Sequence, residues 1–327
     1  MRLLIELSME CESLARAEAL AGARALGGEP LVVCTNRGTL VMETEADPLE
    51  LASRLGLCHF VDEWLGSCEP SELEKCAEDI EIEGPIRVRS TKVGDLRINL
   101  ADASRRLGRI LAERGGVDLH HPRSDIRAVF TDTVHIGRVL ASVDRPSFEK
   151  RKNRYMPFVY PASLHPKFAR AMVNLTEVPK GGRLLDPFCG TGAIVAEASM
   201  LGMEAIGTDF SERMIEGARR NLTHLGLRGD LALCDVGEIP RIVGEVDGIA
   251  TDPPYGRSTS TKGESISALY RRAFAAFAGV LQRGARAVVA VPRPALLDNI
   301  DSFRLIDKHP LWVHRSLTRN FCVLERV

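Results

Sequence analysis

A stretch of nine residues decides the fold class: Leu184-Leu185-Asp186-Pro187-Phe188-Cys189-Gly190-Thr191-Gly192. Its apolar start and its acid predict a short buried strand, and the Gly-x-Gly turn predicts that a helix begins at about Ala193. Such a turn lets a ligand approach the backbone and meet the N–H groups of the first helical turn. Because the third glycine of a dinucleotide fingerprint is missing, the turn alone is weak evidence for a bound nucleotide.

Strands and helices alternate in the sequence that follows this turn. Further strands are predicted over residues 205–209, 231–234, 248–251 and 287–291. Helices are predicted from Ser211, as N-cap, to Leu225 and from Ser265 to Leu281. This alternation predicts a parallel, doubly wound sheet. The tail predicts an antiparallel hairpin at one edge of that sheet, with strands at 311–314 and 321–324 around a turn at 317–320.

The first 68 residues follow a different order. Strands are predicted at 3–7, 31–34, 40–43 and 58–64, with a helix from Ser13 to Leu26 and a short helix that Pro48 opens. The turn Asn36-Arg37-Gly38 is a hairpin signal. The resulting order β-α-β-β-α-β is typical of a small ferredoxin-like α+β unit.

Charge is unevenly distributed along a chain whose formal net charge is only −1. Residues 1–84 carry 6 Lys and Arg against 18 Asp and Glu, whereas residues 85–170 carry 18 against 8. A basic block of this kind predicts nucleic acid as a partner, although solvated helix faces are the plainer alternative. The candidate contacts form two clusters: Arg105, Arg106 and Arg109 on a helix predicted near 101–113, and Lys150, Arg151, Lys152 and Arg154 in the segment 144–160.

Composition and cysteine spacing bound the remaining function classes. With 45% apolar and 27% charged residues and no uncharged run near the ~18 residues needed to span a bilayer, the chain is expected to be soluble and cytoplasmic, with no membrane partner. The acid at Glu6 argues against a signal peptide. No pair among the 8 cysteines has C-x-x-C spacing, so reduced core thiols are expected and no metal. A metal cluster of Cys58, His59, Cys68 and Cys76 is the alternative.

Two further acids end predicted strands. Asp209 lies 17 residues past Gly192, where a carboxylate can accept from both ribose hydroxyls of an adenosine. Asp235 could accept from an adenine amine, and the Val236 N–H could donate to the ring. The alternatives are a helix N-terminal acid beside Ser211 and a loop-capping acid, respectively.

The tetrapeptide Asp252-Pro253-Pro254-Tyr255 follows the fourth predicted strand of this region. Its prolines fix the backbone and leave the Pro253 carbonyl free, because no N–H follows it. A carboxylate and a carbonyl side by side can accept both hydrogens of a planar amino group, and Tyr255 can stack on a base. Accepting those N–H bonds turns the nitrogen lone pair toward an electrophile, and the fixed anion stabilises the positive charge that develops.

These motifs carry a family resemblance. Residues 186–192 with Asp252 to Tyr255 resemble the motifs of S-adenosylmethionine-dependent amino-methyltransferases. Residues 161–175 resemble the segment before the first motif in archaeal THUMP-domain tRNA (guanosine-10 N2)-methyltransferases. The resemblance is strong over about 158–258, weaker over 86–143 and limited to layout over 1–84. Tyr160 departs from the family pattern, in which His is expected.

The resemblance implies the architecture and the reaction. The expected fold is an α/β, Rossmann-like, seven-stranded methyltransferase domain over 161–327, preceded by a ferredoxin-like domain (1–68), a THUMP RNA-binding domain (69–143) and a linker (144–160). The implied reaction is methyl transfer from S-adenosyl-L-methionine to the N2 amine of guanosine 10 in tRNA, with S-adenosyl-L-homocysteine as product. One or two methyl groups can be added. Position 10 is normally paired, so the base must leave its stem at a cost of a few kcal/mol.

The resemblance also implies roles for single residues. Asp252 and Pro253 orient the guanine amine and Tyr255 stacks on the base. Asp209 holds the cofactor ribose, and Ser163 reaches the methionine carboxylate. The full set of implied cofactor-binding residues is Ser163, Asp186, Phe188, Cys189, Gly190, Thr191, Gly192, Asp209, Phe210, Asp235 and Val236.

Three other functions remain open on the sequence. A DNA or ribosomal RNA amino-methyltransferase would share the Asp-Pro-Pro-Tyr chemistry and differ in its partner. A cytosine C5 enzyme is disfavoured because the motif holds no thiol nucleophile, and Cys189 is better explained as a small residue beside the cofactor. A non-catalytic tRNA-binding subunit is disfavoured by the presence of Asp252. A protein partner is possible but not indicated.

Overall fold

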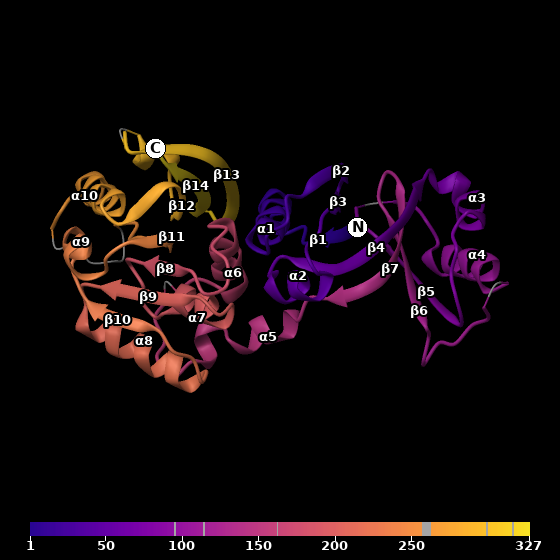
Figure 1. Ribbon diagram of the computed structural model, residues 1–327, viewed down its shortest axis with the longest axis horizontal. Coiled ribbons are helices and arrows are strands. Elements are labelled where there is room, and N and C mark those ends of the chain that lie inside the picture. The colour runs from indigo at the N-terminus through magenta and orange to yellow at the C-terminus, as the bar shows by residue number, and fades with distance from the viewer. Residues whose placement is uncertain (95, 114, 162, 257–262, 299, 316) are drawn as a thin grey trace. The chain divides into compact units, whose positions relative to one another are not determined.

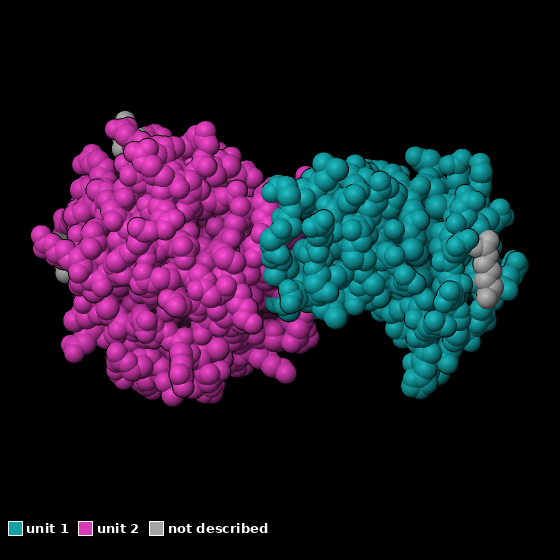
Figure 2. Space-filling model, viewed as in Figure 1, with its two compact units in different colours: residues 1–12, 26–53, 58–143 teal, residues 13–25, 54–57, 144–327 magenta. Residues whose placement is uncertain are grey.

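The computed structural model describes residues 1–94, 96–113, 115–161, 163–256, 263–298, 300–315 and 317–327. The chain divides into two compact units (Figure 2). Unit 1 comprises residues 1–12, 26–53 and 58–143, and unit 2 comprises residues 13–25, 54–57 and 144–327. Each unit is built on a seven-stranded sheet (Figure 1). Within the described residues, no helix combines the length and the apolar character needed to cross a membrane.

The sheet of unit 1 has the strand order β2-β3-β1-β4-β7-β6-β5. Its strands are β1 (Arg2–Leu7), β2 (Leu31–Asn36), β3 (Thr39–Glu43), β4 (Cys58–Cys68), β5 (Ile86–Lys92), β6 (Ser124–Phe130) and β7 (Val134–Ser142). The helical segments that accompany them are α2 (Pro48–Arg54), η1 (Pro70–Glu72), α3 (Leu73–Glu78) and α4 (Leu100–Ala112). Neighbouring strands are antiparallel except β5 and β6, which run parallel.

The predicted order β-α-β-β-α-β is present at the start of the chain. Strand β4 extends beyond the predicted Trp64, because its second half pairs with β7 as far as Cys68, opposite Val134. The segments predicted as separate domains, 1–68 and 69–143, therefore contribute strands to one continuous sheet. Helices α3 and α4 cover one face of β5, β6 and β7 through an apolar core that includes Leu73, Leu107 and Phe130.

The sheet of unit 2 has the order β10-β9-β8-β11-β12-β14-β13. Its strands are β8 (Arg183–Asp186), β9 (Glu204–Asp209), β10 (Asp230–Leu233), β11 (Val246–Thr251), β12 (Leu281–Val291), β13 (Phe303–His314) and β14 (Leu317–Arg326). The longer helices are α1 (Glu12–Ala25, all but its first residue in this unit), α6 (Pro166–Leu175), α7 (Ala193–Met200), α8 (Glu212–His224) and α10 (Ile266–Ala278). The short ones are α5 (Arg145–Lys150), η2 (Asn153–Tyr155), η3 (Val236–Glu238), α9 (Ile239–Ile242) and η4 (Pro294–Leu297).

Strands β8 to β12 are parallel, and the hairpin of β13 and β14 adds to β12 antiparallel. The predicted parallel sheet with an antiparallel hairpin at its edge is therefore confirmed. The chain leaves β8 for β9 on one side of the sheet and later returns to β11 on the other side. The carboxyl ends of β8 and β11 thus flank a topological switch point, where open α/β sheets bind ligands.

Two local predictions in unit 2 are wrong. The turn expected at 317–320 lies inside β14, because these residues pair with β13 as far as Leu317 opposite His314. The helix expected to reach Leu281 ends at Ala278, and Leu281 already begins β12. The segment 144–160, predicted as a linker, contains α5, because Asp144 accepts from the Ser147 N–H at 3.3 Å and Pro146 favours the first turn.

Candidate active site at the carboxyl ends of the parallel strands

The loop after β8 is shaped by two glycines with positive φ, Gly190 at 50° and Gly192 at 82°. Gly192 is the N-cap of α7, and its N–H donates to the Cys189 carbonyl at 2.7 Å. A Cβ added at Gly190 would meet only the Phe188 carbonyl oxygen, at 3.9 Å. The space over Gly190 is therefore open to a ligand.

Asp209 ends the neighbouring strand β9 and holds this loop in place. Its carboxylate accepts from the Gly190 N–H at 3.1 Å and from the Ser211 N–H at 2.9 Å. Ser211 occupies the N-cap position of α8 as predicted, but its side chain makes no capping bond. The acid instead takes the N–H of Ser211 itself, so the predicted hydroxyl cap is wrong. A carboxylate fixed by two amides can still accept from a ligand, because each oxygen has two lone pairs.

Asp235 follows β10 and caps the short helix η3 that comes after it. It is the N-cap of η3 and accepts from the Gly237 N–H at 3.0 Å. It also forms an ion pair with Arg272 of α10. The loop-capping function is thus observed, and the half-exposed carboxylate lies next to the buried Val236 at the same end of the sheet.

Asp252 follows β11 at the centre of a hydrogen-bonded cluster. The Tyr255 hydroxyl donates to Asp252 Oδ1 at 2.5 Å, and Arg319 Nη2 lies 3.3 Å from Asp252 Oδ2. Arg319 Nε donates to the Tyr255 oxygen at 2.9 Å, and its guanidinium carbon lies 5.8 Å from the centre of the Tyr255 ring. The side chains of Asp252 and Arg319 are 15% and 14% exposed, so the cluster is mostly shielded yet reachable.

The acids at these strand ends influence one another. Burial, together with the smaller effect of the charges of Asp209 and Asp252, raises the pKa of Asp186 to about 7, although bonds from the Thr251 hydroxyl at 2.7 Å and the Phe188 N–H lower it. Burial also raises the pKa of Asp209 and of Asp252. For Asp252, the charge of Arg319 and the Tyr255 bond partly offset that rise. The three carboxylates therefore share one partly desolvated region, which is unfavourable unless a polar or cationic ligand compensates it.

The other predicted cofactor residues lie around the same loop. Ser163 donates to the Tyr160 carbonyl at 2.9 Å and lies 3.0 Å from the Thr191 hydroxyl, so the segment before the first motif meets the Gly-x-Gly turn. Residue 162 of that segment lies outside the described residues. Cys189 is buried, with its N–H bonded to the Thr208 carbonyl at 2.9 Å. Burial raises its pKa well above the usual range, which does not suit a nucleophile. Phe188 and Phe210 are half-buried beside these residues in the sequence.

The predicted nucleic-acid contacts differ in accessibility. Arg105 and Arg109 are exposed on α4, and Arg106 of the same helix pairs with Glu74 at 2.8 Å. Lys150 and Arg154 are exposed, and Lys152 pairs with Glu149.

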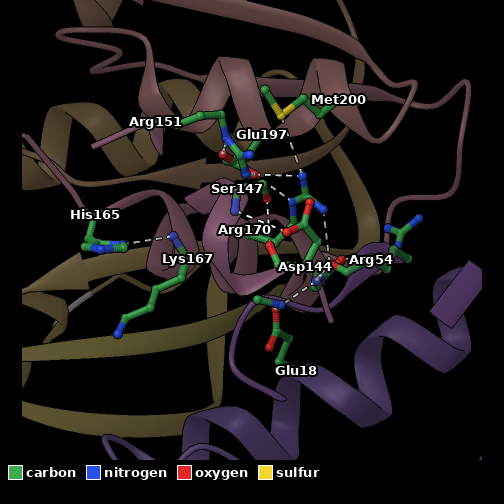
Figure 3. A network of polar contacts seen from close by, with 12 residues as sticks. Glu18, Arg54, Asp144, Ser147, Arg151, His165, Lys167, Arg170, Glu197 and Met200 are labelled. Carbon is green, nitrogen blue, oxygen red and sulfur yellow. Dashed lines mark hydrogen bonds and ion pairs between the residues drawn. The ribbon is translucent and has the colours of Figure 1, made fainter. Parts of the chain in front are cut away.

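Arg151 is placed differently from its neighbours. Its side chain is 12% exposed and bonds both oxygens of Glu197 on α7, at 3.0 and 3.2 Å. Glu197 also accepts from Arg170 of α6. Arg170 and Asn174 both donate to the Arg54 carbonyl, and Asn174 also donates to Glu18 on α1 (Figure 3). Arg151 is therefore committed to an internal ion pair and is not presented to a phosphate. Among the described residues, no group of three or more His, Cys, Asp and Glu is close enough to hold a metal.

Arg319 is the residue of this site that sequence reasoning missed. It lies 67 residues after Asp252, in a stretch that was predicted as the turn of an edge hairpin and is instead part of β14. The available signal was a single arginine next to the apolar run Phe321–Leu324 of a buried strand, where a charge requires a partner.

Comparison with known proteins gives consistent matches. The RMKL-like methyltransferase domain family (UPF0020) matches residues 153–320. A protein of Methanothermobacter thermautotrophicus named tRNA (guanine(10)-N2)-dimethyltransferase is 35% identical over 100% of both chains. The crystal structure of TrmN from Thermus thermophilus aligns over 100% of both chains with a TM-score of 0.57 and 23% identity. A putative methyltransferase, SMU.472, solved with S-adenosylhomocysteine, aligns over 100% of this chain and 98% of its own with a TM-score of 0.54 and 16% identity, so both structures show a common fold.

Proposed function

The chain belongs to the tRNA (guanine(10)-N2)-dimethyltransferase family, and we propose that it methylates the N2 amine of guanosine 10 in tRNA with S-adenosylmethionine. The observation that carries the proposal is the placement of Asp252. Its carboxylate follows β11 at the switch point of a methyltransferase fold and is held by Tyr255 and Arg319, near the acid that ends β8.

The cofactor site is proposed at the loop after β8. Asp209 would hold the ribose hydroxyls, Asp235 and the Val236 N–H the adenine, and residues 186–192 with Ser163 the methionine end. The open space over Gly190 and the shared region of acids fit a ligand that carries hydroxyl, amine and sulfonium groups. When bound, S-adenosylmethionine supplies an electrophilic methyl group.

The residues of the chain would prepare the amine. Asp252 and the Pro253 carbonyl accept its two N–H bonds, which turns the nitrogen lone pair away from them and toward the methyl donor. The Asp252 carboxylate stabilises the positive charge that develops on nitrogen and can take the proton that the nitrogen releases. Tyr255 would present its ring to the base while its hydroxyl keeps Asp252 in one orientation.

The sheet of unit 1 is proposed to serve tRNA binding. Residues 1–68 have the element order and the strand order β2-β3-β1-β4 of a ferredoxin-like unit, and residues 69–143 would form a THUMP domain. The exposed Arg105 and Arg109 with Arg106 on α4, and Lys150, Lys152 and Arg154 after β7, would contact phosphates. A tRNA-modifying enzyme of this kind is expected in the cytoplasm.

The direct test is labelled methyl transfer from S-adenosylmethionine to an unmodified tRNA transcript. Transfer is expected with guanosine at position 10 and is expected to fall to background when adenosine replaces it, with the opposite nucleotide changed to keep the pair. Nucleoside digestion then separates N2-methylguanosine from N2,N2-dimethylguanosine. Equal transfer to both transcripts would contradict the position, and transfer only to duplex DNA or ribosomal RNA would contradict the substrate class.

A further inference from the structure

Arg319 has hydrogen-bond donors beyond those that contact Tyr255 and Asp252. Its guanidinium has five N–H groups, and the two contacts described above use Nε toward Tyr255 and Nη2 toward Asp252. The remaining N–H groups lie beside the carboxylate that is proposed to bind the substrate amine. A planar cation next to a carboxylate thus presents adjacent donors and acceptors in one fixed arrangement.

The charge of Arg319 favours the form of Asp252 that accepts hydrogen bonds. Burial alone would favour the protonated carboxyl, which donates a hydrogen bond, whereas the positive charge of Arg319 favours the ionised form, which only accepts. The side chains that share this environment are Tyr255, Tyr270 and Asp186, and Arg319 is the cation among the groups that act on Asp252. The pair therefore offers two acceptor oxygens followed by donors.

This order of groups matches one base. The Watson–Crick edge of guanine carries two neighbouring donors, N2–H and N1–H, followed by the acceptor O6. Adenine carries a donor amine followed by the acceptor N1, which would face the second carboxylate oxygen without a proton between them. Unpaired polar groups in a shielded site are costly, so the mismatch would discriminate strongly.

We propose that Arg319 is a specificity-determining residue, which donates a hydrogen bond to O6 of guanine while Asp252 accepts from N2–H and N1–H. This inference rests on the proposed function, since it assigns the contacts of the same base. The 3.3 Å separation of Arg319 Nη2 and Asp252 Oδ2 lets the two atoms meet neighbouring groups on one base edge. Tyr255 connects both residues and holds the pair in register.

The test uses tRNA with 2-aminopurine at position 10, which keeps the 2-amino group but lacks O6 and the N1 proton. The quantity measured is the ratio of kcat/KM for guanine to that for 2-aminopurine, in wild type and in Arg319→Met. Wild type is expected to prefer guanine, and the ratio is expected to fall by about 10-fold or more in Arg319→Met, because this variant cannot make the charge-assisted hydrogen bond to guanine. The analogue also changes base pairing within the tRNA, but this effect cancels when the ratio of the variant is compared with that of wild type, because both enzymes receive the same RNAs.

Two further variants make the result specific. Arg304→Met removes an exposed arginine of the same hairpin, paired with Glu325, and is expected to keep the wild-type ratio. Arg319→Lys keeps the charge but not the planar fork and is expected to give an intermediate ratio. Thermal melting shows which variants fold. If Arg319→Met does not fold, the ratio measured for Arg319→Lys provides the test.

The outcomes separate this inference from the proposed function. No transfer to guanosine 10 by wild type would overturn both. Normal transfer by wild type with an unchanged ratio in folded Arg319 variants would overturn the role of Arg319 alone, even if their overall rates fall.

Discussion

The two sheets of this protein both bury charge, but at different places along their strands. In unit 1, Arg127 of β6 and Asp62 of β4 lie within their strands, are 1% and 0% exposed, and form an ion pair of 2.8 Å to which Glu6 also contributes. In unit 2, Asp186, Asp209 and Asp252 lie where strands end. A charge within a sheet can bind only the protein groups packed on it, whereas a charge at the carboxyl end of a strand can meet a ligand. The first arrangement should govern stability and the second should govern function.

The largest effect is expected from breaking the charge within the sheet. Arg127→Met leaves Asp62 buried without its cation and should lower the free energy of unfolding of unit 1 by about 3–5 kcal/mol, as measured by urea denaturation. Arg123→Met, which removes an exposed arginine next to β6, is the control and should change it little. The double variant Arg127→Met, Asp62→Leu should recover part of the stability. A cost below about 1 kcal/mol for Arg127→Met would contradict the structural role of the pair.

At the carboxyl end of β11, the expected effect of breaking a charge is on turnover. Asp252→Ala should lower turnover at least ~10²-fold while barely changing cofactor affinity, because the carboxylate is proposed to act on charge that develops only during transfer. Single-turnover kinetics and cofactor titration measure the two quantities. Asp247→Ala, at the other end of β11, where Asp247 accepts from the Arg183 N–H at 2.7 Å, should keep near-normal turnover. Near-normal turnover in Asp252→Ala would remove the mechanism.

A smaller effect is expected for the charges exposed on α4. Replacing Arg105, Arg106 and Arg109 with Glu should weaken tRNA binding and flatten its dependence on salt. The slope of log K against log salt should change by about one unit for each phosphate that the variant no longer neutralises. Binding is measured at several salt concentrations. Arg241→Glu, on exposed α9, is a control for the change in charge. An unchanged slope would place the RNA surface elsewhere.

A pH-dependent effect on stability is expected from Asp186. Its pKa is raised from 3.8 to about 7, so the folded state binds the proton more tightly than the unfolded state. The stabilisation is full below pH 3.8 and is lost as pH rises through about 7, so the free energy of unfolding should fall over that range. Asp186→Asn, which can still accept from Thr251 and Phe188, should remove most of this fall, as measured by denaturation at each pH. A steeper fall in the variant would contradict the assignment.

Much of unit 2 was predictable because its signals are local. The strand ending in Asp186, the glycine turn and the acid at Asp209 are each set by residues next to one another in the chain. In the structure α7 begins at Ala193, as expected, and both glycines of the turn have positive φ. The prediction of a hairpin turn at 317–320 was wrong because the structure there is set by non-local pairing. Polar residues favour a turn there, but pairing with β13 over the whole of β14 outweighs that preference.

Residue roles were less predictable than elements. Arg151 was grouped with its basic neighbours in the sequence, yet it is the one of that cluster held by Glu197, from a helix 46 residues later. Composition identifies a basic segment, but which of its side chains face solvent depends on what packs against it.

The sequence by itself determined the order of elements, the parallel sheet, the open turn for a ligand and the carboxylate that follows β11. Each of these depends on the conformational preferences of a few consecutive residues or on the spacing of apolar ones, which any reader of the chain can see. Only the tertiary structure decided that β4 pairs with β7 to join two predicted domains in one sheet, and that Arg319 lies against Asp252. Those contacts join residues more than sixty positions apart, and they form because the sheet brings distant strands together, not because either segment prefers the other.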